Sequence, residues 1–219
     1  MTTPRDPATR WLMQLAYRPR ALLVSALLLA PLLGLLGWMA WQEYRTEMQA
    51  ERTALQRHVE IAARTVAWAH AQEAAGKMDR ASAQRLALGA VKAMRYGSGE
   101  YFWINDLAPT MVMHPIKPEL DGKALGDMKD PNGVALFVEF VRVASTQKAG
   151  FVAYQWPKPG HDKPVDKVSY VQAFEPWGWV IGSGVYVDQV LANARARWLH
   201  DGAIAAAVML LAAYALNGF

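Results

Sequence analysis

Residues 165–188 read VDKVSYVQAFEPWGWVIGSGVYVD, and this stretch decides the fold class. Its two runs, 165–174 and 179–187, are rich in the β-branched and aromatic residues that favour strands. A turn that contains Pro and Gly separates the two runs. Asp188 then stands where the N-cap of a helix is expected. The stretch therefore predicts two antiparallel strands and a helix that leaves the sheet.

Three more strands are predicted upstream of this stretch. YFWIN (101–105) and TMVMH (110–114) are aromatic or apolar runs joined by a short turn, so they form a hairpin. FVAYQW (151–156) has the same composition. Helices precede and interrupt the strands, so the fold class is α+β with a five-stranded antiparallel sheet.

Residues 42–75 predict one long helix, because they are rich in Glu, Arg, Gln and Ala and contain no Gly or Pro. Apolar side chains recur along it as a narrow seam: Tyr44, Met48, Leu55, Val59, Ala62, Val66 and Ala69. A seam this narrow suits a partner helix as well as the core of the domain itself. We expect a homodimer from it.

Two shorter helices are expected between the long helix and the third strand. Asp79 is the predicted N-cap of the first, which ends near Met94. Its predicted apolar face is Leu86, Ala90 and Met94. The second follows the DPNG turn, with a predicted apolar face of Val134, Phe137, Val138, Val141 and Ala144.

Residues 21–41 carry no charged side chain and are long enough to cross the hydrocarbon core of a bilayer. Arginines precede this run and glutamates follow it. The positive-inside rule then predicts a cytoplasmic N-terminus at 1–20, a transmembrane helix at 21–41 and a periplasmic domain at 42–200. A cleaved signal peptide is the alternative, but the residues after Trp41 make a poor cleavage site.

Residues 203–219 form a second apolar run, at the short limit for a membrane span. A buried helix of a soluble domain is the alternative. We expect a second transmembrane helix, truncated at or near Phe219, and hence a multi-pass protein of the inner membrane with its main domain in the periplasm.

Composition excludes several classes of function. The 219-residue chain has a net charge of +4 and no cysteine, which rules out a disulfide framework, thiol catalysis and cysteine-ligated metals. Much of the positive charge lies in the first twenty residues, so no stripe for nucleic acid is visible. No phosphate loop, zinc-protease or serine-hydrolase motif is present. We expect neither enzymatic activity nor a cofactor.

Five strings resemble a known family: YFWIND (101–106), MVMHPIKPELDGK (111–123), DPNG with LFVEFV (130–141), GFVAYQWPKPG (150–160) and KVSYVQAFEPWGWVIGSGVYVD (167–188). In this order they resemble the single-Cache sensor domain, an extracytoplasmic ligand-binding module of bacterial methyl-accepting chemotaxis proteins and some sensor kinases. The resemblance covers about residues 44–190. It implies a PAS-like sheet on the long helix between two membrane spans. Such receptors continue into a signalling region, so cytoplasmic partners are expected only if the chain continues beyond Phe219.

The resemblance also implies a small ligand, often a short carboxylate. Such a ligand needs one or two cations or hydrogen-bond donors in a mostly apolar cavity. His114 and Lys167 are the candidates for the charge. The further candidates, for shape and hydrogen bonds, are Tyr101, Trp103, Tyr154, Tyr170 and Arg95.

Each candidate also has an ordinary structural interpretation. The aromatic residues suit core packing, His114 suits a core histidine bonded to the backbone, and Lys167 suits a solvated charge on an edge strand. Arg95 suits the surface. Side chains alternate along a strand, so Lys167 and Tyr170 line one pocket only with a bulge or a lateral site. Gly182 and Gly184 in the last strand indicate bulges or close backbone approach.

The predicted function is a membrane-anchored receptor that binds a small organic acid such as pyruvate, lactate, acetate or propionate. The last strand and the helix after Asp188 then pass a displacement into the second span. Two alternatives stay open: a periplasmic interaction or scaffold protein without a small ligand, and the sensor half of a histidine kinase.

Overall fold

The computed structural model describes residues 17–97 and 99–217. The chain divides into two compact units, Met1–Arg45 and Thr46–Phe219. Residues 1–16 and 218–219 lie outside the described residues, and with them most of the predicted cytoplasmic N-terminus and the end of the second predicted span.

The sheet of the second unit has six strands in the order β1-β2-β6-β5-β4, with β3 paired to β2 and every pairing antiparallel. The strands are β1 (Arg95–Tyr96), β2 (Glu100–Asp106), β3 (Met111–Met113), β4 (Ala149–Pro157), β5 (Pro164–Phe174) and β6 (Trp179–Tyr186). All five predicted strands are present. The sixth, β1, was missed because a turn folds two residues back onto β2, pairing Arg95 with Tyr101.

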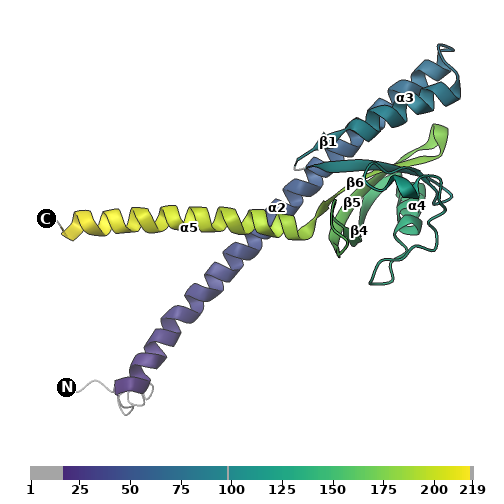
Figure 1. The fold of residues 1–219 in the computed structure, drawn as a ribbon. Coiled ribbons are helices and arrows are strands. Elements are labelled where there is room, and N and C mark those ends of the chain that lie inside the picture. Colours follow the sequence, from purple (N-terminus) through teal and green to yellow (C-terminus); the bar gives the residue numbers. More distant parts are fainter. Residues whose placement is uncertain (1–16, 98, 218–219) are drawn as a thin grey trace, which may run out of the picture. The chain divides into compact units, whose positions relative to one another are not determined.

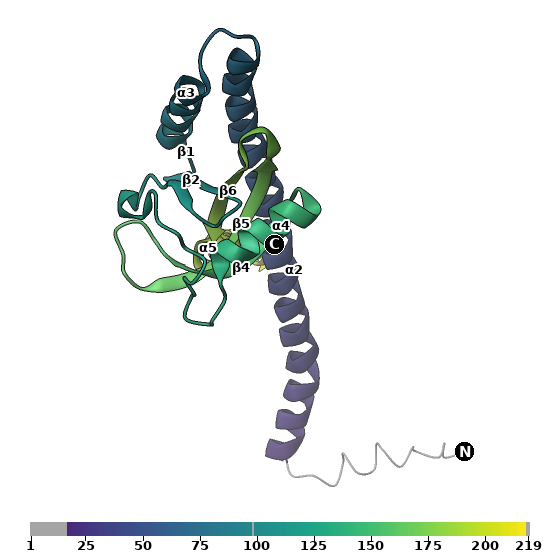
Figure 2. The ribbon, with the colours of Figure 1, turned by 90° about the vertical axis from the view of Figure 1, so that its right-hand side faces the viewer.

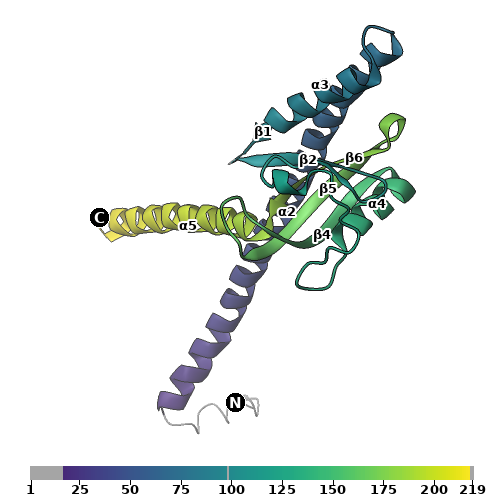
Figure 3. The ribbon, with the colours of Figure 1, turned by 45° about the vertical axis from the view of Figure 1, so that its right-hand side comes forward.

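Helices cover both faces of this sheet (Figures 1 and 3). They are α2 (Tyr17–Ala74), α3 (Arg80–Ala93), α4 (Leu136–Gln147) and α5 (Val187–Asn217), with short 3-10 turns at Pro118–Leu120 and Glu175–Trp177. The second half of α2 and α3 share one apolar cluster with one face of the sheet, and α4 shares another with the opposite face. Figure 2 shows α3 running beside the C-terminal part of α2.

The apolar seam of the long helix packs inside its own domain. Leu55, Val59, Ala62, Val66 and Ala69 are all buried in the cluster that includes α3 and the sheet. The seam is therefore already covered by this chain, and the expectation of a homodimer through it loses its support.

The two shorter helices start close to where the sequence predicts, but their buried faces differ from the prediction. Asp79 caps α3 by accepting a hydrogen bond from the backbone N–H of Ser82. The buried face of α3 is Ala83, Ala87 and Val91, and Leu86 is 41% exposed. The buried face of α4 is Leu136, Phe137, Phe140, Val143 and Ala144. The pattern favoured large side chains, whereas close packing of α3 selects alanines.

The predicted spans at 21–41 and 203–219 lie in α2 and α5, apart from the last two residues. Within the described residues, no helix combines the length and the hydropathy that a membrane crossing requires. Both spans stay predictions.

Candidate functional site

Strand pairing brings four of the predicted residues onto the face of the sheet that α4 covers. Lys167 of β5 pairs with Tyr154 of β4 on one side and with Tyr186 of β6 on the other. Directly paired residues point to the same face. Tyr101 and Trp103 of β2 belong to the same apolar cluster as Tyr154 and α4. These five residues and His114 form the cluster that we call the Lys167 site.

Lys167 is a buried cation at the centre of this site. Its side chain is 2% exposed, and β5 lies between two strands, so the interpretation as a solvated edge charge is wrong. The ammonium donates to the hydroxyls of Tyr101 at 3.1 Å and Tyr186 at 3.5 Å. It also lies 4.5, 4.7 and 5.7 Å from the ring centroids of Tyr101, Tyr186 and Trp103.

None of the ion pairs in the described part of the chain involves Lys167. Removing an ion from water costs several kcal/mol, and aromatic rings recover only about 0.5–2 kcal/mol each. The site is therefore electrostatically prepared for an anion.

His114 supplies a hydrogen-bond donor to this site and no charge. Its Nδ1 accepts from the backbone N–H groups of Ile116 at 3.2 Å and Lys117 at 2.9 Å. Burial, with the charges of Lys167 and Lys117, lowers the pKa of His114 to about 3. The neutral ring then carries its proton on Nε2, and it lies 5.0 Å from the Tyr101 ring. The prediction of a charged His114 is wrong, because the sequence does not reveal this burial.

Two phenols of the site, those of Tyr154 and Tyr186, stay protonated. Burial raises the pKa of Tyr154, whose hydroxyl lies 2.9 Å from Ser169 Oγ. Burial also raises the pKa of Tyr186, whose hydroxyl donates to the carbonyl of Pro157 at 2.8 Å. Tyr186 was missed at the sequence level, although alternation with Gly182 and Gly184 would place it on their face.

The glycines of β6 make room for the cluster, as the sequence indicates. A Cβ at Gly184 would stand 2.0 Å from Ser169 Oγ and 2.8 Å from Lys167 Cε. A Cβ at Gly182 would stand 2.3 Å from the ring of Trp103. Real Cβ atoms essentially never approach so closely, so only glycine permits this packing.

Two predicted residues lie away from the Lys167 site. Tyr170 belongs to the apolar cluster on the α2 side of the sheet, and no bulge interrupts the pairing of β5 with its neighbours. Arg95 is exposed and donates to the backbone carbonyls of Lys92 and Met94. The structure therefore does not bring Tyr170 or Arg95 together with Lys167.

A partly open cavity of about 260 Å³ lies next to the site, and we call it the mouth cavity. Its lining includes Tyr101 and Tyr186 of the Lys167 site, with Gly184 beside them. Lys158 and His161, from the loop between β4 and β5, also line it. The cavity therefore borders two residues of the site, while Lys167 itself stays buried behind its lining.

The structure thus combines an antiparallel sheet on a long helix with a buried cation among aromatic rings on the opposite face. Residues 47–198 match the family described as single Cache domain 2, and the chain belongs to that family.

The relatives are chemotaxis receptors and sensor kinases. The methyl-accepting chemotaxis protein McpP of Pseudomonas putida is 46% identical over 192 residues, which cover 88% of this chain and 35% of McpP. The sensor histidine kinase MctS of Rhizobium johnstonii is 33% identical over 122 residues, covering 56% and 26%. This chain therefore spans about a third or less of these two relatives.

Solved structures of sensor domains show the same fold. One is described as "Structural basis for carboxylic acid recognition by a Cache chemosensory domain"; it is 47% identical with a TM-score of 0.63 and covers 64% of this chain and 95% of its own. Another, a "periplasmic sensor domain of chemotaxis protein", is 50% identical with the same TM-score and covers 64% and 98%. Both support the assignment of this chain as a Cache sensor domain of the chemotaxis-receptor kind.

Proposed function

We propose that this chain is the sensing part of a membrane-anchored chemoreceptor, and that its periplasmic domain binds a short monocarboxylate such as acetate, propionate, pyruvate or lactate. The observation that carries the proposal is the buried ammonium of Lys167, which has aromatic and hydroxyl neighbours but no carboxylate partner among residues 17–97 and 99–217. A ligand carboxylate would form an ion pair with this ammonium and neutralise its charge.

The neighbouring groups suit one carboxylate with a small apolar tail. The hydroxyl of Tyr101 and the Nε2–H of His114 are donors that a carboxylate accepts from, whereas the hydroxyl of Tyr186 already donates to Pro157. The rings of Trp103 and Phe140, with centroids 5.2 Å apart, offer apolar surface. A single buried cation favours one carboxylate over two, because a second would stay unpaired.

We propose that the signal leaves through the end of β6. Tyr186 accepts from Lys167 and is followed directly by Val187, the first residue of α5. Tyr186 also donates to Pro157, and the next residue, Lys158, pairs with Asp188 of α5 at 2.7 Å. An anion that draws Lys167 away from Tyr186 would disturb this network, and α5 shifts only if the anion binds one state better.

The proposal is tested by thermal unfolding of the full chain in detergent with acetate, propionate, pyruvate, lactate and succinate. A ligand at a hundred times its Kd adds about 2.7 kcal/mol, or about 5–10 °C for a chain of this length. The shift with a monocarboxylate should vanish in Lys167→Met and persist in Lys123→Met, an exposed control. A shift that survives Lys167→Met would refute the proposed site, and no shift in the folded wild type would favour an interaction protein.

The sensor half of a histidine kinase is a second candidate, favoured by the similarity to MctS. The sensing site is the same in both cases. Fusion of the chain to a chemoreceptor signalling region and to a kinase region, each assayed with and without acetate, would distinguish the two outputs.

We further propose the membrane topology that the charge pattern predicts, with helices at 21–41 and 203–219 and the domain in the periplasm. Periplasmic alkaline phosphatase fused after residue 200 should be active, and inactivity would contradict this topology.

A homodimer is retained only on another face of α2, where Ile61 and Trp68 are 57% and 56% exposed seven residues apart. Trp68→Lys should then lower the mass measured by light scattering to that of a monomer.

A further inference from the structure

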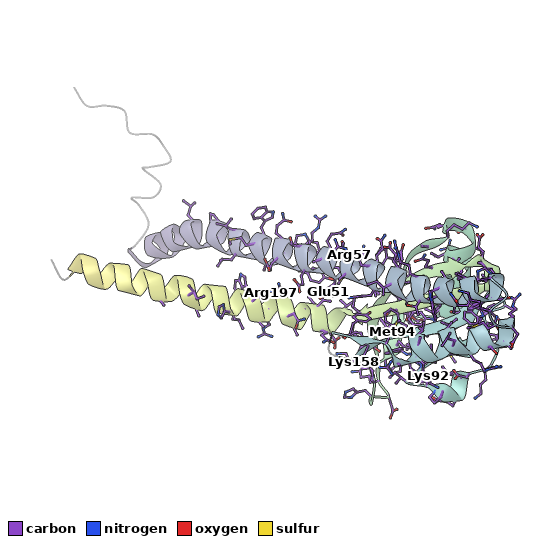
Figure 4. The ribbon with its side chains drawn as sticks, turned by 90° about the horizontal axis from the view of Figure 1, so that it is seen from above. Glu51, Arg57, Lys92, Met94, Lys158 and Arg197 are labelled. Carbon is purple, nitrogen blue, oxygen red and sulfur yellow. The ribbon has the colours of Figure 1, made fainter. Side chains whose placement is uncertain are left out.

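A second cavity, of about 220 Å³, lies on the other side of the sheet end, between α2 and α5. We call it the α2–α5 cavity. Its polar lining comes from five elements: Glu51 and His58 of α2, Tyr96 of β1, Glu100 of β2, Tyr186 of β6, and Gln189 and Asn193 of α5. Figure 4 shows Glu51 on the side of α2 that faces α5. Tyr186 belongs to the Lys167 site as well, but Lys167 itself is not among the residues that line this cavity.

The lining is rich in acceptors and contains no Lys or Arg. Glu51 and Glu100 take part in none of the ion pairs found in the described segments. By contrast Glu47, one turn away on α2, pairs with Arg197 of α5. The negative charge also acts on Tyr96, because burial first, and then Glu100 and Glu51, raise the pKa of its phenol.

Two lining residues each carry a buried polar atom without a hydrogen bond to any described protein group: His58 Nδ1 and Glu100 Oε2. Both are held in place. The ring of His58 stacks on that of Tyr96 with centroids 4.1 Å apart, and the hydroxyl of Tyr96 is fixed 2.6 Å from Ser183 Oγ. Glu100 Oε2 lies so close to Gly97 that a Cβ there would stand 2.4 Å away. Buried polar atoms of this kind call for a partner.

The chemistry of that partner follows from the lining. Carboxylates and amide oxygens accept hydrogen bonds, so the partner needs a positive charge and several N–H donors. The volume holds several heavy atoms, since one water takes about 30 Å³. Within the residues that the structure describes, no three His, Asp or Glu side chains are placed to hold a metal ion. We propose that the α2–α5 cavity is a second ligand site, which binds a small organic ammonium ion.

An ammonium ion in this cavity would contact α2 and the first turns of α5 together, through Glu51 on one side and Gln189 and Asn193 on the other. The ion pair of Arg197 with Glu47 already joins α5 to α2 through a cation. A bound ammonium ion would join the same two helices in the same way. The affinity for the ammonium ion therefore depends on the position of α5 relative to α2. A cation bound in this cavity would in turn favour one position of α5.

The test is thermal unfolding and calorimetric titration of the full chain in detergent with n-propylammonium chloride. Propan-1-ol serves as the neutral control of the same shape, and sodium chloride as the control for ionic strength. We expect propylammonium alone to raise the midpoint of unfolding. Glu100→Gln and Glu51→Gln should each weaken its binding about tenfold. Glu119→Gln, the same change at an exposed position, should leave binding unchanged.

Equal shifts with propylammonium and sodium chloride, or unchanged affinity in Glu51→Gln, would overturn the proposal. If Glu100→Gln does not fold, Glu51→Gln on the outer helix decides alone. Acetate is titrated into the same variants. Loss of acetate binding in Lys167→Met with propylammonium binding intact shows that the two sites are separate, and failure of the acetate experiment leaves the propylammonium result readable on its own.

Discussion

Replacement of Lys167 by Met should make the ligand-free protein more stable while it removes carboxylate binding. Burial of the ammonium costs several kcal/mol. Its two hydrogen bonds, at 3.1 and 3.5 Å, and its three ring contacts at 4.5–5.7 Å offset only part of that cost. Met has a similar length and adapts its shape to the space. Tyr186 keeps its bond to Pro157 in the variant.

The net gain for Lys167→Met is about 1–2 kcal/mol, because replacing buried charge by apolar side chains of similar volume gains ~1–4 kcal/mol. For a chain of this length that raises the midpoint of thermal unfolding by about 2–8 °C. The assay is thermal unfolding in detergent by tryptophan fluorescence, with and without acetate, and with Lys123→Met as the exposed control.

Two results would refute this reasoning. A midpoint for Lys167→Met below that of the wild type would show that the ammonium stabilises the ligand-free domain. An acetate shift of the same size in the variant would show that the anion binds elsewhere. The predicted combination, higher stability and lost binding, distinguishes a functional cation from a structural one, because a structural cation would lose stability on replacement.

Two further predictions concern His114 and Gly184. The folded-state pKa of His114, about 3, lies below its ordinary value of 6.5, so stability is full above pH 6.5 and falls as the pH drops toward 3. Urea unfolding at pH 7.5 and pH 5 should show a loss for the wild type about 2 kcal/mol larger than for His114→Asn, which keeps an acceptor for the backbone; equal losses would contradict the neutral buried ring. Gly184→Ala should destabilise the fold by about 1–3 kcal/mol and abolish acetate binding, since its Cβ meets Ser169, Lys167 and the backbone of Val168. Gly126→Ala, with nothing within 4 Å, is the neutral control.

The sequence predicted the secondary structure well where the signal is local. The strand expected at 165–174 is β5 at Pro164–Phe174, and Asp79 caps α3 as its side chain allows. The sequence did not predict features that depend on which other element a segment packs against. The two residues of β1 have no strand signal and extend only because a turn lays them on β2. The buried face of α3 was wrong because apolar size does not say which side of a helix meets a close neighbour.

The candidate site shows the same division. Alternation alone separated Lys167 from Tyr170, and the structure keeps them on opposite sides of the sheet. The alternation of side chains along β6 does not by itself reveal how β6 is aligned with β5, so the sequence did not place Tyr186 opposite Lys167. The charge state of His114 was beyond the sequence, because it depends on burial and on two lysines brought near by the fold.

The end of β6 lies between the two proposed ligand sites. Glu100, Tyr186 and Gln189 border both the mouth cavity and the α2–α5 cavity, so the two cavities share these three residues. A ligand at either place contacts the segment that becomes α5 at Val187. If an anion at Lys167 and a cation at Glu51 both change where α5 stands, their binding free energies are coupled. That coupling is reciprocal by thermodynamic necessity, so the factor by which acetate changes propylammonium affinity equals the factor in the opposite direction.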